Sequence, residues 1–252
     1  DTLIIEPGTS ILFMGSYRFD VEGNLIAVGT EQDSIYITSG NAVPSPTDWK
    51  GIYIKQTADV DAGKRVITFQ YCNIGYGGTS YALIYDNYAF DSERSQWDNV
   101  QEVPYLYIMN CFIHHASETA ITSNLSRLYL SDSRLDNNGM SLYIDYGMGS
   151  KILNNEFYND DSDNWNSIFG INMNNYQISS KFEIKNNVFY TANQFGWINN
   201  ESDNNDSSSF FFTFTYNSFS FKLHSFNNAS SLSSEANCNM EIISLISNFN
   251  LL

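Results

Sequence analysis

Residues 128–157 read LYLSDSRLDNNGMSLYIDYGMGSKILNNEF and contain one short pattern twice, led first by Ser133 and then by Asn155. Each copy has a small or amide side chain, then a variable residue, then a large apolar residue. The pattern recurs, at the same interval or a longer one, at sites led by Cys72, Cys111, Asn187, Asn217 and Ser247. A period of about 22 residues with occasional longer intervals is typical of a solenoid.

Short apolar runs precede this pattern. Between Thr2 and Ile54, apolar and polar residues alternate in short runs that are bounded by Gly, Pro, Asn and Asp. This alternation predicts β-strands, and it has no helical period. One coil of the solenoid, here called a rung, cannot bury both faces of its strands, so successive rungs must stack. We therefore expect one all-β domain over residues 1–252.

The order of motifs near the start of the chain is similar to that of a known class of proteins. PGTSILF, VEGNLIAVGT, SIYITS and DWKGIYI follow one another within residues 7–54. This order resembles the opening of secreted right-handed parallel β-helix proteins of the pectin-lyase-like architecture. The resemblance implies a right-handed parallel β-helix and a secreted protein. About ten rungs, spaced by about 4.8 Å, would form a rod roughly 45–50 Å long.

Stacked rungs would place the leading residues of the repeated pattern in one ladder. We expect this structural ladder to contain Cys72, Cys111, Ser133, Asn155, Asn187, Asn217 and Ser247. Stacked Asn side chains can hydrogen-bond to one another, and the following Phe residues can form an aromatic column. Two neighbouring positions of the ladder are cysteines, which could form either a stack of thiols or a disulfide between rungs.

The bulk composition limits the partners of the chain. Its formal net charge is −16, with 12 Lys and Arg against 28 Asp and Glu, which argues against nucleic-acid binding. No apolar run approaches the length of a membrane span. The chain begins at Asp1, which fits either a mature product or an excised segment. We expect an extracellular or cell-surface location.

The longer intervals between pattern copies predict loops, most of which should leave the rod on one common edge. All four N-glycosylation sequons fall on that edge, at Asn124, Asn200, Asn205 and Asn228. In a secretory eukaryote some of these would carry glycans. The sequons could equally arise by chance in a chain rich in Asn, Ser and Thr.

Two features of the loops have weaker functional interpretations. Asp160, Asp161 and Asp163 could supply oxygen ligands to Ca²⁺, and no other cofactor is expected. Trp97 and Trp165 lie in polar loops and could stack on sugar rings or contact a partner. The alternative for each is an ordinary solvated loop.

Catalytic and metal-binding arrangements are not evident. Pectin-lyase-like enzymes would need a basic residue beside bound Ca²⁺ or a group of Asp residues, and their recognisable motifs do not occur. Arg134 and Glu156 should be outward-facing neighbours that form a surface ion pair. His114 and His115 should point to opposite faces of a strand and so cannot share a metal.

We therefore expect a non-enzymatic extracellular structural or surface module. No capping helix is evident at the first or last rung, so these rungs could pair with copies of the chain or with adjacent β-helix segments. The alternatives are a β-helix protein that binds or cleaves polysaccharides, and an adhesin domain.

Overall fold

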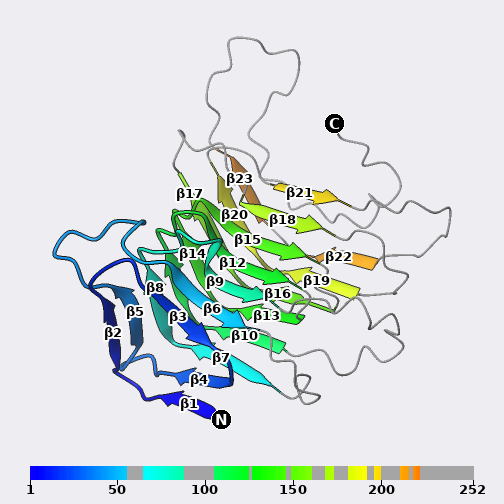
Figure 1. The fold of residues 1–252 in the computed structure, drawn as a ribbon. Coiled ribbons are helices and arrows are strands. Elements are labelled where there is room, and N and C mark those ends of the chain that lie inside the picture. The colour runs from blue at the N-terminus through cyan, green and yellow to red at the C-terminus, as the bar shows by residue number, and fades with distance from the viewer. Residues whose placement is uncertain are drawn as a thin grey trace, which may run out of the picture.

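The computed structural model is a parallel β-helix built from three parallel sheets (Figure 1). It describes residues 1–55, 65–87, 105–124, 127–145, 149–160, 168–172, 181–191, 196–199, 211–215 and 218–221. Successive strands pass from the first sheet to the second and then the third, and the fourth strand returns to the first sheet beside β1. The described residues contain no helix.

Each sheet adds one strand per rung. The first sheet contains β1 (Thr2–Ile5), β4 (Asn24–Val28), β7 (Val66–Gln70), β10 (Tyr105–Met109), β13 (Arg127–Ser131), β16 (Lys151–Leu153), β19 (Lys181–Lys185) and β22 (Phe211–Thr215). The second sheet contains β2 (Ser10–Phe13), β5 (Ile35–Ser39), β8 (Cys72–Gly75), β11 (Phe112–His114), β14 (Arg134–Asp136), β17 (Glu156–Asn159), β20 (Val188–Thr191) and β23 (Ser218–Phe221). The third sheet contains β3 (Arg18–Val21), β6 (Gly51–Lys55), β9 (Ala82–Asn87), β12 (Thr119–Asn124), β15 (Met140–Asp145), β18 (Phe169–Asn172) and β21 (Gly196–Asn199).

The fold confirms the predicted all-β solenoid. Eight strands in each of the first two sheets and seven in the third belong to the described residues. The count of about ten rungs stays a prediction, because residues 222–252 are not described.

The core is a set of apolar columns between the three sheets. In the second sheet, Ile74, Ile113, Leu135, Phe157 and Phe189 occupy successive positions of one inward column. All five side chains are buried, and the Phe157 and Phe189 rings stack with centroids 4.8 Å apart. The predicted aromatic column is therefore part of the interior. Continuous burial over many rungs accounts for much of the hydrophobic stabilisation of such a rod.

A left-handed backbone residue makes the bend between the first and second sheets on each of five rungs. Tyr71, Asn110, Asp132, Asn154 and Asn186 have φ between 51° and 58°, and each directly precedes a residue of the ladder. Asn and Asp tolerate this conformation better than other non-glycine residues. Asn186 also donates to Asn154, and Asn154 donates to Asp132, each at 3.0 Å, so the bends form an exposed polar ladder of their own.

Candidate functional surfaces

The predicted ladder is present at the five positions that the structure describes: Cys72, Cys111, Ser133, Asn155 and Asn187. The backbone N–H of Cys111 donates to Ser133 Oγ at 3.0 Å, and the N–H of Ser133 donates to Asn155 Oδ1 at 3.0 Å. All five residues are buried, which assigns the ladder to the scaffold. Asn217 and Ser247 lie outside the described residues.

Cys72 and Cys111 are buried free cysteines rather than a disulfide. The Cys111 thiol donates to the carbonyl oxygen of Met109 at 3.2 Å, and the Cys72 thiol lies 3.5 Å from that of Ala27. The pKa of Cys72 is raised, first by its hydrogen bond with the Cys111 thiol and then by burial. The arrangement is therefore the stack of thiols, one of the two forms that the sequence left open.

In the described structure the first rung leaves part of one end of the hydrophobic core open, although its Ile5 and Val21 are only 6% and 5% exposed. Leu3 pairs with Leu25 in the same inward column, yet Leu3 is 48% exposed whereas Leu25 is 0% exposed. Ile11, Phe13 and Phe19 pack against the core and are only partly buried. Among the described strands, β1, β2 and β3 each have a hydrogen-bonded neighbour on one side only. Apolar side chains and unpaired strand edges therefore meet at this end.

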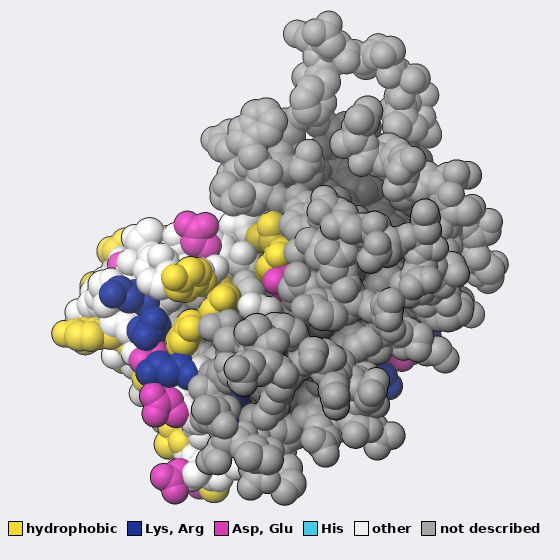
Figure 2. Space-filling view, turned by 45° about the vertical axis from the view of Figure 1, so that its right-hand side comes forward, with side chains coloured by type: hydrophobic (Ala, Val, Ile, Leu, Met, Phe, Trp, Pro, Cys, Tyr) yellow, Lys and Arg dark blue, Asp and Glu magenta, His cyan; other side chains and the backbone are white. Residues whose placement is uncertain are grey.

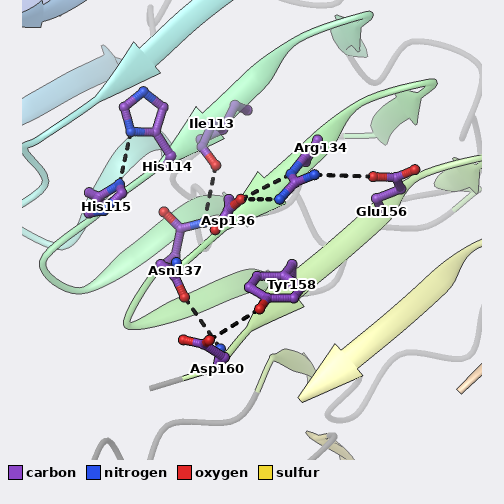
Figure 3. A network of polar contacts seen from close by, with 10 residues as sticks. Ile113, His114, His115, Arg134, Asp136, Asn137, Glu156, Tyr158 and Asp160 are labelled. Carbon is purple, nitrogen blue, oxygen red and sulfur yellow. Dashed lines mark hydrogen bonds and ion pairs between the residues drawn. The ribbon is translucent and has the colours of Figure 1, made fainter. Parts of the chain in front are cut away.

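The outer face of the second sheet carries a polar network that joins β11, β14 and β17 (Figure 3). Arg134 donates from Nε and Nη2 to Asp136 Oδ2, at 2.9 and 2.5 Å, and its Nη1 lies 3.7 Å from Glu156 Oε2. Tyr158 donates its hydroxyl to Asp160 at 3.1 Å. The Asp136 hydrogen bond raises the pKa of Arg134, so this side chain stays a cation. The predicted Arg134–Glu156 surface pair is confirmed, with Asp136 as the nearer partner.

The predicted placement of His114 and His115 on opposite faces of a strand was wrong. β11 ends at His114, and His115 has a φ of 51°, so the chain turns and the second ring returns toward the first. Their Nδ1 atoms lie 3.0 Å apart, and His114 Nε2 lies 2.9 Å from Asn73 Oδ1. Burial, and then the nearby His115, lower the pKa of His114 to about 4. Within the described ranges, no three His, Cys, Asp or Glu residues are grouped to hold a metal.

The outer face of the third sheet is rich in tyrosine near its first strands. The rings of Tyr53 and Tyr85 stack with centroids 5.3 Å apart, and the Arg18 guanidinium lies 4.5 Å from the Tyr53 centroid. Asp20 accepts from Arg18 and also lies 3.1 Å from Lys55 Nζ. Figure 2 shows basic, acidic and hydrophobic side chains mixed on the described part of one molecular face.

The structure describes the predicted loops only at the residues where they join the rod. β9 ends at Asn87 and β21 at Asn199, directly before the predicted insertions, which supports a common edge after the third sheet. Asn124 is the last residue of β12, and its side chain hydrogen-bonds Tyr85. Asp160 is exposed and follows β17. The other loop candidates lie outside the described residues: Asn200, Asn205, Asn228, Asp161, Asp163, Trp97 and Trp165.

Sequence reasoning identified Arg134 and Glu156 on the outer face of the second sheet but missed Asp136, Tyr158 and Tyr190, although the repeat contained the necessary signal. Residues one and three positions after each ladder residue face outward, as with Glu156 and Tyr158 after Asn155. The same offset from Asn187 finds Val188 and Tyr190. Reading the pattern at both offsets would have added Asp136 and the tyrosines to the predicted pair of Arg134 and Glu156.

The sequence matches no protein-family model, and comparisons with curated proteins and with solved structures find no significant match. Among the described residues, no helix is long and apolar enough to cross a membrane.

Proposed function

We propose that this chain is a non-enzymatic structural module of an extracellular or cell-surface assembly, joined to a further β-helical rung through its first rung. The observation that carries the proposal is the open core end, where Leu3 is 48% exposed although its column partner Leu25 is fully buried. The partner rung would come from a second copy of the chain or from an adjacent β-helix segment.

The physical argument rests on two kinds of unsatisfied surface at one place. Burial of inward-facing apolar side chains lowers the free energy of the assembly by roughly 25 cal/mol for each Å² of apolar surface removed from water. The free edges of β1, β2 and β3 also offer N–H and C=O groups to another strand. A rung with parallel strands in register satisfies both requirements, because this is how β4, β5 and β6 already cover the other side.

The rest of the described structure is consistent with a scaffold. Asn155 and Asn187 are hydrogen-bonded within the rod, and Asp136 is held by Arg134. The acidic composition would keep such a module soluble while it assembles. Extracellular location is supported by the sequons and by the motif order at the start of the chain.

Self-assembly can be tested by sedimentation velocity over a range of protein concentrations. We expect the wild-type chain to associate, and Leu3→Lys to weaken association by about tenfold or more, because a charge would enter the buried junction. Val43→Lys is the matched control, since Val43 is 85% exposed and lies outside the first rung. A wild-type chain that stays monomeric at every concentration, or equal association of both variants, would contradict assembly from copies of this chain.

A further inference from the structure

We propose that His114 and His115, at the bend that follows β11, bind a divalent transition-metal ion and prefer Cu²⁺. Their two Nδ1 atoms lie 3.0 Å apart, and Figure 3 shows the two rings in contact at this bend. We call these two residues the histidine pair. The site goes beyond the structural role and does not depend on the first rung.

The backbone brings together two rings that a straight strand would separate. β11 ends at His114, and the left-handed φ of 51° at His115 turns the chain back. The His114 ring lies over Gly75 of β8, where an added Cβ would be 2.5 Å from Cε1 and 2.8 Å from Nδ1 of the ring. A side chain at position 75 would therefore displace the ring. The bend and the glycine together position the histidine pair.

The hydrogen bonds of His114 leave a lone pair on its Nδ1 atom. Its Nε2 lies 2.9 Å from Asn73 Oδ1, and because this oxygen can only accept, Nε2 carries the hydrogen. Nδ1 of the neutral ring is then an acceptor, and it accepts the Nδ1–H of His115. Histidines that bind metals are commonly held in this way, with the second ring nitrogen donating to an oxygen. Asn73 is therefore a positioning residue for the site.

The separation of the two nitrogen atoms selects among metal ions. With metal–nitrogen bonds of about 2.0–2.1 Å, two nitrogens 3.0 Å apart subtend roughly 90–100° at the ion. This is close to the right angle between neighbouring ligands of a square-planar or tetragonal site, which Cu²⁺ and Ni²⁺ favour, and smaller than the tetrahedral angle that Zn²⁺ favours. Cu²⁺ also binds nitrogen ligands most strongly in the Irving–Williams order. Ca²⁺ and Mg²⁺ favour oxygen ligands and do not suit two imidazoles.

A bound ion would take the place of the hydrogen between the two rings. His115 would adopt its other neutral tautomer, with the hydrogen on Nε2, so that both Nδ1 lone pairs face the ion. The half-buried side chain of His115 gives the ion access from solvent, whereas His114 is only 7% exposed. Burial lowers the pKa of His114 to about 4, so no proton competes for its lone pair at pH 7. The carboxylate of Asp136 acts on the same ring and favours a cation there.

The number of protein ligands sets what each histidine contributes. Within the described ranges, no three His, Cys, Asp or Glu residues are grouped to hold a metal, so water would complete the coordination of the ion. Binding therefore depends on both members of the histidine pair, and the loss of either leaves a single imidazole. A contact that only closes the bend would give no affinity for Cu²⁺, which separates this site from a purely structural role.

Electron paramagnetic resonance of the wild-type protein with an equimolar amount of Cu²⁺ tests the site without any substitution. We expect a tetragonal spectrum with coupling to two imidazole nitrogens. Calorimetric titrations with Cu²⁺, Ni²⁺ and Zn²⁺ should give one ion per chain at the site and the tightest binding for Cu²⁺. A spectrum identical to that of Cu²⁺ in buffer, or coupling to fewer than two imidazole nitrogens, would overturn the proposal.

Variants locate the ion on the molecule. His114→Gln and His115→Gln should each weaken Cu²⁺ binding by about tenfold or more in the same titrations, because each removes one of two ligands. His224→Gln is the matched control, since His224 is the third histidine of the sequence and is not part of the pair. Unchanged binding in either variant of the histidine pair, or an equal loss in His224→Gln, would place the ion elsewhere and overturn the proposal.

Substitution of Asn73 separates positioning of the ring from general stability. Asn73→Leu removes the acceptor of the His114 Nε2–H and should weaken Cu²⁺ binding by about tenfold. Asn73→Asp keeps an acceptor at this position and should retain the wild-type affinity. Equal affinities of the two variants would show that Asn73 does not orient the ring.

Discussion

The side-chain oxygen of Asn187 accepts two hydrogen bonds from Asn155 in the interior of the rod. Asn187 Oδ1 accepts the side-chain N–H of Asn155 at 3.0 Å and its backbone N–H at 2.9 Å. Asn187 in turn donates to the carbonyl oxygen of Ile152 at 2.8 Å. Each amide therefore satisfies polar groups on its own rung and on its neighbour, which fixes the register of the stack.

Removal of this shared acceptor should destabilise the fold. Asn187→Ala leaves two buried N–H donors of Asn155 without that acceptor, so we expect the free energy of unfolding to fall by about 1–3 kcal/mol. Val43→Ala, at a loop residue that is 85% exposed, should change it by less than about 0.5 kcal/mol. Urea denaturation measures both, and equal effects would show that the ladder adds no stability.

The left-handed bends predict a different pattern of substitutions. Asn110 has a φ of 53°, so Asn110→Val should lower the free energy of unfolding by roughly 1–2 kcal/mol because a β-branched side chain clashes there. Asn110→Gly should be tolerated much better, since glycine adopts this conformation readily. If the two variants had equal stability, the backbone conformation assigned to this bend would be wrong.

The two core thiols should be unreactive until the protein unfolds. Cys72 and Cys111 are 2% and 3% exposed, and a raised pKa keeps the Cys72 thiol protonated. Because the thiolate is the reactive form, burial and protonation both lower the reactivity of a thiol. Peptide mass spectrometry after iodoacetamide treatment should find both unmodified in native protein and modified in urea. A peptide pair joined through these residues would instead show a disulfide.

His114 should make the stability depend on pH. Its pKa is about 4 in the fold and 6.5 ordinarily, so the unfolded chain binds more protons between these values. The stability contribution is complete above pH 6.5 and is lost as the pH falls toward 4, by roughly 3 kcal/mol. Burial is the largest cause of the lowered pKa, His115 lowers it further, and Asp136 raises it. The other side chains in contact with the His114 ring are those of Asn73, Tyr76 and Phe112.

The test compares wild type with His114→Gln by urea denaturation from pH 4.5 to 7.5. The variant should lose part of the pH dependence, whereas acidic side chains elsewhere contribute equally to both proteins. His115→Gln should keep most of the pH dependence, because burial rather than His115 is the largest cause of the lowered pKa of His114. Parallel pH profiles for wild type and His114→Gln would contradict the assigned burial of His114.

The sequence predicted what repeats from rung to rung. Equal spacing placed Ser133, Asn155 and Asn187 in one ladder, and the same register placed Arg134 beside Glu156. These predictions succeeded because stacking in register carries a local pattern directly into three dimensions. The stack of Phe157 and Phe189 follows from the same logic.

The sequence did not predict what depends on single backbone angles or on exposure. A strand pattern alone separates His114 from His115, but a φ of 51° at His115 brings their rings together. The pattern of Leu3 likewise matches that of Leu25, and only the stacking order shows that Leu3 has no rung above it in the described structure. The sequence predicted an uncapped first rung, but the exposure of Leu3 required coordinates.

The most direct test of the proposed structural role is hydroxyl-radical footprinting of the protein in its native assembly. If a further rung covers the first one, Leu3 and Phe13 should be strongly protected while Val43 is oxidised. Leu3→Lys should restore oxidation of Phe13 by disrupting the junction. Oxidation of Leu3 in the wild-type assembly to the extent expected of a half-exposed leucine would contradict the account.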